Sequence, residues 1–278
     1  MANAYQNMTD AELDAAIAAL EDQADDLRAL GLRLDMARGK PSPEQTALSR
    51  PMLDLLTSES DLSDGGVDAD NYGAPDGLPS ARALAAELIG VDPANVSVMG
   101  SSSLNIMYDC VEHGYVHGIG GEKPWCQQGV VKFLCPAPGY DRHFTVTESF
   151  GIQNVPVPMR EDGPDMDVVR EYVEGDATVK GIWCVPRYAN PTGVTYSDDV
   201  VRAFAALRPA APDFRVFWDN AYAVHTFRGE GDHLLNIFDA LAEQGGDKNL
   251  VYEFASTAKV TFPSSGMAWI AASAADMA

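Results

Sequence analysis

Short apolar runs rich in β-branched residues recur along the chain from about residue 80 onward. Each run is too short for a typical helix, and many of them are bounded by turn-forming residues, which is characteristic of strands. The seven runs are 96–99, 130–134, 152–157, 181–185, 215–218, 250–254 and 267–271. Several are apolar at successive positions, as expected for strands that are covered on both faces.

Helical patterns lie between several of these runs, at 80–88, 167–173 and 198–207. Strands that alternate with helices predict an α/β fold with a mainly parallel, seven-stranded sheet and helices on both faces. A separate helix is expected near the N-terminus, with an N-cap at Thr9, apolar residues at helical spacing and an end near Gly31. Residues 36–80 are rich in Pro, Gly, Ser and Asp, which favours loops.

The composition is that of a soluble globular protein, with 46% hydrophobic and 22% charged residues among 278. The net charge of −22 repels nucleic acids and anionic membranes, so neither is an expected partner. The N-terminus lacks the basic start and apolar core of a signal peptide, which favours a cytoplasmic location. The four cysteines have no CxxC spacing and no accompanying His cluster, so we expect reduced thiols and no metal site.

Residues that could bind a ligand or take part in catalysis follow the predicted strands. Ligands of parallel sheets bind beyond the carboxyl ends of the strands, and this is where these residues lie. The segments are Gly-Ser-Ser-Ser at 100–103, Gly-Tyr-Asp-Arg-His at 139–143, Asn-Pro-Thr-Gly at 190–193, Asp-Asn-Ala-Tyr at 219–222 and Ser-Thr-Ala-Lys at 256–259. Taken singly, each has an ordinary interpretation as a helix cap, a turn, a packing residue or a solvated lysine.

The order of these motifs resembles that of the class I/II aminotransferases, which are fold type I pyridoxal-phosphate enzymes. The resemblance extends from about Arg38 to the end of the chain. The sequence around these motifs looks most like the bacterial aspartate aminotransferase subgroup that also resembles MocR-type regulator domains. The stretches that carry this likeness are 38–41, 71–77, 102–107, 138–144, 161–167 and 218–225.

The resemblance implies pyridoxal 5′-phosphate as cofactor, bound as a Schiff base to Lys259. The freed amine of Lys259 would then move the substrate proton, a task for which burial lowers a lysine pKa. Asp219 would pair with the pyridinium nitrogen and keep the ring able to accept electrons. His143 would hydrogen-bond that carboxylate, and Tyr140 would stack on the ring. Tyr222 would hold the phenolic oxygen of the cofactor.

Further positions follow from the same resemblance. Asn190 would also bind the phenolic oxygen and lie near the substrate. The cofactor phosphate would lie on the turn formed by Gly100, Ser101 and Ser102, with help from Ser256. Tyr72 would reach the phosphate of a neighbouring subunit, which implies a homodimer with shared active sites. Gly39 would lie in a loop near the substrate.

Two departures from the family pattern matter. Many members carry a phosphate-binding arginine eight residues after the lysine, where this chain has Met267; the hydroxyls of 261–266 are expected to replace it. The second departure is that the C-terminal small domain, with the arginine that clamps the substrate carboxylate, is expected to be absent.

The same resemblance divides the chain into two parts. We expect residues 1–50 to form an N-terminal helix and arm that is part of a small domain, and residues 51–278 to form the cofactor-binding large domain.

These features leave several functions open. The first is an aminotransferase that acts on aspartate or another dicarboxylic amino acid with a 2-oxo acid. A pyridoxal-phosphate lyase or decarboxylase would use the same cofactor residues. A truncated, inactive cofactor-binding remnant is a third alternative. An effector domain of a DNA-binding regulator would require a basic domain, and the acidic chain argues against one.

Overall fold

The computed structural model describes residues 5–34, 41–227 and 229–277, and the chain divides into two compact units, Met1–Lys40 and Pro41–Ala278. The first unit contains helix α1 (Asp10–Ala29), which buries none of its residues. Thr9 caps α1: its hydroxyl accepts a hydrogen bond from the Glu12 amide, and the Glu12 carboxylate accepts one from the Thr9 amide. This reciprocal capping satisfies amides that the helix leaves unpaired and confirms the predicted helix start.

The second unit begins with short elements. These are α2 (Pro43–Ala47), the 3-10 helix η1 (Arg50–Asp54) and the two-residue strands β1 (Ser63–Asp64) and β2 (Val67–Asp68). Little of this segment is regular, as its turn-rich composition predicts. Among the described residues, none of the helices combines the length and the hydrophobicity needed to cross a lipid bilayer.

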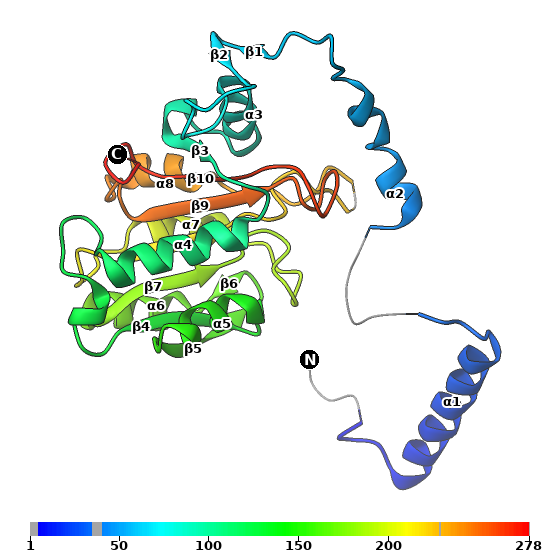
Figure 1. Ribbon diagram of the computed structural model, residues 1–278. Coiled ribbons are helices and arrows are strands. Elements are labelled where there is room, and N and C mark those ends of the chain that lie inside the picture. Colours follow the sequence, from blue (N-terminus) through cyan, green and yellow to red (C-terminus); the bar gives the residue numbers. More distant parts are fainter. Residues whose placement is uncertain (1–4, 35–40, 228, 278) are drawn as a thin grey trace. The chain divides into compact units, whose positions relative to one another are not determined.

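An eight-stranded sheet forms the centre of the second unit (Figure 1). Its order is β3-β10-β9-β8-β7-β4-β5-β6. The strands are β3 (Val96–Val98), β4 (Lys132–Ala137), β5 (Gln153–Arg160), β6 (Gly163–Pro164), β7 (Val179–Cys184), β8 (Arg215–Asp219), β9 (Val251–Ser256) and β10 (Ala268–Ala271). Strands β5, β4, β7, β8 and β9 run parallel, whereas β10 is antiparallel to both β3 and β9.

All seven predicted runs form strands, and the α/β prediction is confirmed. The eighth strand, β6, is a two-residue edge that pairs with the end of β5. A run of two residues that includes a proline carries no periodic signal, so the sequence could not reveal it.

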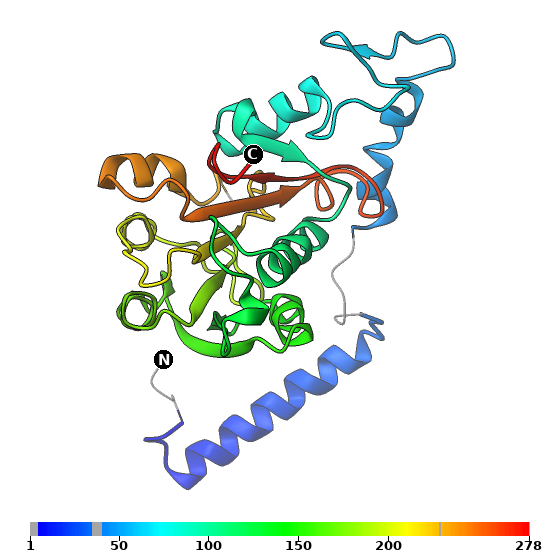
Figure 2. The ribbon, with the colours of Figure 1, turned by 60° about the vertical axis from the view of Figure 1, so that its left-hand side comes forward.

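Helices cover both faces of the sheet (Figure 2). The α4 face carries α4 (Ser103–Val116) and α5 (Asp141–Ser149), and the opposite α8 face carries α6 (Met166–Gly175), α7 (Asp198–Ala205) and α8 (Ile237–Gln244). Helix α3 (Pro79–Ile89) packs over β3 and β10, and the 3-10 helices η2 (Pro93–Asn95) and η3 (Trp125–Gln127) lie in connections. Each face therefore has its own hydrophobic cluster.

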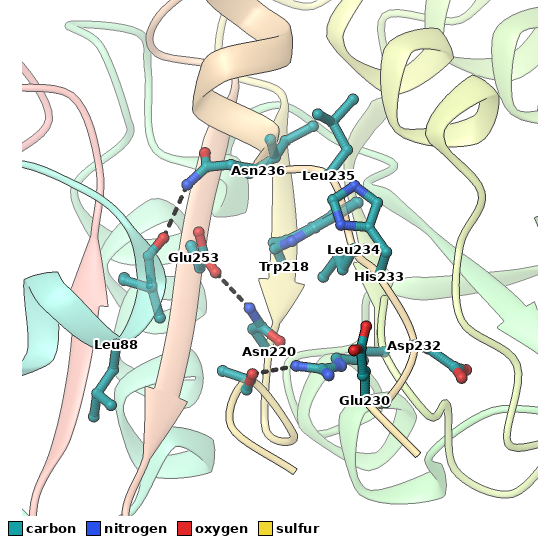
Figure 3. Close-up of a pocket in the computed structure, with 15 residues that line it drawn as sticks. Leu88, Trp218, Asn220, Glu230, Asp232, His233, Leu234, Leu235, Asn236 and Glu253 are labelled. Carbon is teal, nitrogen blue, oxygen red and sulfur yellow. Dashed lines mark hydrogen bonds between the residues drawn. The ribbon is translucent and has the colours of Figure 1, made fainter. Parts of the chain in front are cut away.

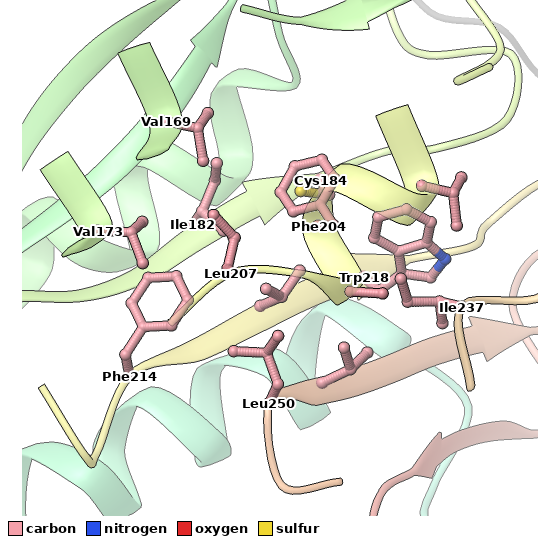
Figure 4. Close-up of a cluster of buried hydrophobic side chains, with 14 of the residues drawn as sticks. Val169, Val173, Ile182, Cys184, Phe204, Leu207, Phe214, Trp218, Ile237 and Leu250 are labelled. Carbon is pink, nitrogen blue, oxygen red and sulfur yellow. The ribbon is translucent and has the colours of Figure 1, made fainter. Parts of the chain in front are cut away.

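Strand β8 shows how the two faces are separated. Phe217 packs in the cluster of the α4 face, and Trp218 packs in the cluster of the α8 face with Phe204 and Ile237 (Figure 4). Successive side chains of a strand point to opposite faces. The two residues that end this strand region, Asp219 and Asn220, consequently contact partners on different faces of the sheet.

Buried ion pairs lie near the amino ends of the central strands. Lys180 Nζ lies 2.6 Å from Asp213 Oδ1, and both side chains are buried. Arg215 donates two hydrogen bonds of 3.0 Å to the carboxylate of Asp276. The two-pronged geometry satisfies both charges away from water. These pairs stabilise the end of the sheet that is opposite to the candidate site.

Replacing Asp276 tests this interpretation. The Asp276→Ala substitution removes the carboxylate partner of Arg215, whose side chain is 3% exposed, and leaves it neutral acceptors such as the carbonyls of Pro212 and Phe214. We expect the free energy of unfolding in urea to fall by about 3 kcal/mol, since a buried charge loses its partner. The matched Asp167→Ala removes a 91% exposed carboxylate and should cost less than about 0.5 kcal/mol. Equal losses in the two variants would contradict the assignment.

Candidate functional site

Most of the predicted site residues come together at the carboxyl edge of the parallel strands. Asp219 ends β8, Ser256 ends β9, and Lys259 follows three residues later. Tyr140 and His143 lie where β4 leads into α5, and 100–102 lie where β3 leads into α4. Because parallel strands end at the same edge, residues far apart in the sequence share one region.

A buried contact between Asp219 and His143 is the centre of this region. His143 Nε2 lies 3.0 Å from Asp219 Oδ2, and the two residues are 1% and 5% exposed. The imidazole ring stacks on Trp183 at 4.8 Å between centroids, and the ring of Tyr140 meets its edge at 5.0 Å. The second carboxylate oxygen, Oδ1, is buried and has no hydrogen-bond partner among the described residues. An unpaired buried acceptor costs about 1–3 kcal/mol, which favours a site for an additional donor.

Lys259 lies in the loop between β9 and β10 and is exposed. Its Nζ atom lies 5.0 Å from the centroid of the Tyr222 ring. His225 Nε2 lies 3.1 Å from the backbone oxygen of Lys259 and therefore ties this loop to the segment after β8. The buried environment that the family resemblance implies for this amine is not formed by the described residues alone.

Tyr222 lies close to Lys259 and near enough to Asp219 to be influenced by its charge. Burial raises the pKa of its phenol, and the proximity of Asp219 and Tyr140 raises it further. The phenol consequently keeps its proton at neutral pH. It can donate a hydrogen bond to a negatively charged oxygen but cannot serve as an anionic base.

The turn after β3 has the features of an anion site. Gly100 adopts a positive φ of 62°, which favours glycine, and Ser102 caps α4 by accepting from the Asn105 amide at 3.4 Å. Ser101 is exposed, and Ser256 is half-buried at the end of β9. Backbone amides and hydroxyls at the start of a 14-residue helix suit a phosphate.

Met267 occupies the position where many family members have an arginine. Its amide donates to Thr257 Oγ1 at 3.1 Å, and the Thr257 amide donates to the Met267 carbonyl at 2.9 Å. Thr261 Oγ1 in turn donates to the Thr257 carbonyl. These bonds within the loop fix the segment 257–267, which carries Lys259.

The structure places the remaining predicted residues differently. Asn190 is exposed in the turn after β7, where the Gly193 amide donates to the Ala189 carbonyl, and it lines the same small pocket as Tyr140 and His143. Tyr72 is 98% exposed in the loop before α3. Gly39 lies outside the described residues.

Three residues near the site carry no family assignment in the sequence. Asn220 Nδ2 donates a hydrogen bond of 2.8 Å to Glu253 Oε1, and both side chains are buried. The available signal was Glu253 itself, a charged residue inside the otherwise apolar strand β9. His225 is a third addition, because its contact with the Lys259 backbone depends on loop geometry rather than on sequence spacing.

Comparison with known proteins defines the family. The family described as aspartate amino-transferase matches residues 8–278. The aspartate aminotransferase of Corynebacterium glutamicum is 44% identical over 251 residues, which are 90% of this chain and 58% of that protein. A crystal structure of an aspartate transaminase from Corynebacterium glutamicum has a TM-score of 0.89 and 40% identity, and the match covers 98% of this chain and 64% of that one.

A more distant structure shares the fold. The kynurenine aminotransferase of Pyrococcus horikoshii, solved in complex with PMP, has a TM-score of 0.64 at 17% identity, over 98% of this chain and 63% of that one. The chain thus spans about three fifths of the length of the relatives that it matches. Over that span, the extent of the family match and the identity to the Corynebacterium protein show that the chain belongs to the aspartate aminotransferase family.

Proposed function

We propose that this chain is the cofactor-binding part of an aminotransferase that uses pyridoxal 5′-phosphate and attaches it through Lys259. The observation that carries the proposal is the buried Asp219 carboxylate. His143 holds one of its oxygens, and the other has no partner in the ranges that the structure describes. The carboxylate lies at the same sheet edge as Lys259 and the serine turn.

The residues present fit the cofactor. A protonated ring nitrogen is the donor that the unpaired Asp219 Oδ1 lacks. His143 orients the carboxylate from behind and is itself fixed by Trp183, so the acceptor is positioned before the ligand arrives. When bound, the cofactor supplies an electron sink for charge that develops at the substrate Cα.

Lys259 has the chemistry for attachment and for proton transfer. Its primary amine can form the covalent link and, once free, can remove and return a proton at the substrate Cα. The ring of Tyr222 lies against the Lys259 amine. Its protonated phenol would donate a hydrogen bond to the phenolic oxygen of the cofactor. Asn190 would donate to the same oxygen and lie beside the substrate.

The remaining assignments follow the same division of roles. Gly100, Ser101, Ser102 and Ser256 would hold the phosphate, and Tyr140 would stack on the ring. The exposed Tyr72 would reach the phosphate of a second subunit in a homodimer. Gly39 would lie near the substrate.

The proposed substrates come from the relatives. Two of these are named for aspartate, so we propose aspartate and a 2-oxo acid as the amino donor and acceptor. We also propose that residues 1–50 belong to the small domain and residues 51–278 to the large domain. The closer likeness to the MocR-related subgroup and the cytoplasmic location stay predictions.

Removing the lysine amine tests the attachment. Addition of pyridoxal 5′-phosphate to the wild-type chain should produce a visible absorbance band, and Lys259→Ala should abolish it because no amine remains at the site. Lys248→Ala is the matched control, since Lys248 is exposed and precedes β9 at the opposite end of the sheet. A band of unchanged intensity in Lys259→Ala would contradict the assignment.

The role of Asp219 is tested by Asp219→Asn, which keeps the shape and removes the charge. We expect the Kd for the cofactor to rise at least about tenfold, since a charge-assisted hydrogen bond is lost. When aspartate is added, the rate at which the absorbance band of the bound cofactor changes should fall by a larger factor than the factor by which the Kd rises. Asp213→Asn, at the other end of β8, should lower stability and leave the Kd unchanged. Equal effects of the two substitutions on the Kd would argue against a contact with the ring nitrogen.

A further inference from the structure

A pocket of about 440 Å³ lies on the face of β8 and β9 that is opposite to the contact between Asp219 and His143 (Figure 3). Asn220 and Glu253 form part of its wall, together with the segment 230–237 that leads into α8 and with Leu88 and Ile89 of α3. The Glu253 carboxyl group is 3% exposed within this wall. A buried carboxyl group in a strand requires an explanation, because burial without full pairing is costly.

Glu253 and Asn220 connect the two strands that carry the cofactor residues. Asn220 directly follows Asp219, and its amide donates to the Phe254 carbonyl of β9 at 2.8 Å. Its side chain donates to Glu253 Oε1 at 2.8 Å, and its own Oδ1 has no partner among the described residues. Strand β9 continues through Ser256 to the loop of Lys259.

We propose that Asn220 and Glu253 are a positioning pair that fixes the Asp219 carboxylate relative to Lys259. The inference rests on the proposed function and adds two residues that do not touch the cofactor. The backbone hydrogen bond from the Asn220 amide to the Phe254 carbonyl fixes the position of Asn220 along the neighbouring strand β9. The side-chain hydrogen bond to Glu253 prevents rotation of the turn that follows Asp219. Asp219 and Asn220 leave β8 toward opposite faces, so rotation at Asn220 would turn the carboxylate away from His143.

The strength of this bond depends on the ionisation of Glu253. Burial raises the pKa of Glu253 to about 7, although the hydrogen bond from Asn220 favours the charged form. An amide donates a stronger hydrogen bond to a carboxylate than to a neutral carboxyl group. The pair is therefore tighter above pH 7 than below it.

Other charged groups that line the pocket are already engaged or exposed. Arg187 donates to the Ala223 carbonyl through Nη1, while its Nε is buried without a partner among the described residues. Asp232 accepts from Thr195 Oγ1 at 2.8 Å. His233 Nε2 lies 3.5 Å from Asp198 with its side chain 75% exposed, and Glu230 is exposed. Asn220 is the hydrogen-bond partner that the structure gives Glu253 within this lining.

The experiment measures the Kd for pyridoxal 5′-phosphate at pH 6 and at pH 8 in the whole chain. The ratio of variant to wild type cancels the titration of the cofactor itself. Glu253→Gln keeps an acceptor and removes the charge, so we expect a ratio near one at pH 6 and about three at pH 8. Asn220→Ala removes the bond, so we expect about threefold at pH 6 and about tenfold at pH 8.

The control is Asp276→Asn, which weakens a buried pair at the opposite end of β8. If the substitutions acted only by lowering the stability of the fold, Asp276→Asn would show the same pH-dependent ratio of Kd values as Glu253→Gln and Asn220→Ala. Ratios for Glu253→Gln and Asn220→Ala that are equal at the two pH values would overturn the positioning pair and leave the proposed function intact. Absence of an absorbance band in the wild-type chain would overturn both. If Asn220→Ala does not fold, the conservative Glu253→Gln decides the question alone.

Discussion

The candidate site depends on one buried carboxylate at the end of a parallel strand. Asp219 is 5% exposed, and within the described part of the chain His143 is the hydrogen-bond partner of one of its oxygens while the other oxygen has none. A negative charge in that position is stable only when further donors or a positive ligand satisfy it. The imidazole, the tryptophan stacked on it and the two strands that flank β8 hold the carboxylate in place. The remaining site residues are arranged around this fixed acceptor.

Each face of β8 and β9 carries one of the two contacts that hold the site in place. On the α4 face, Asp219 meets His143, and on the α8 face, Asn220 meets Glu253. The last residue of β8 and the residue that follows it thus anchor the site in two separately packed layers. Because each layer is close-packed, a small displacement on one face is transmitted through the strand to the other. Ion pairs at the amino ends of the strands keep the same sheet fixed at a distance from the site.

The sequence predicted the fold well, and the physical reason is periodicity. Seven apolar runs formed seven strands, and the N-cap pattern at Thr9 and Glu12 located the start of α1. Motif order also placed Asp219, His143 and Lys259 at one edge, since every one of them follows a strand. Contacts that depend on tertiary geometry left no such pattern. The pair of Asn220 and Glu253 joins residues 33 positions apart, and the exposure of Lys259 depends on what surrounds its loop.

The most direct test of the account is the position of the covalent cofactor link. The chain is incubated with pyridoxal 5′-phosphate, reduced with borohydride, digested and analysed by mass spectrometry. The account predicts one modified residue, Lys259, at a stoichiometry near one per chain. Modification that is spread over several exposed lysines, or that is located at another residue, would contradict it.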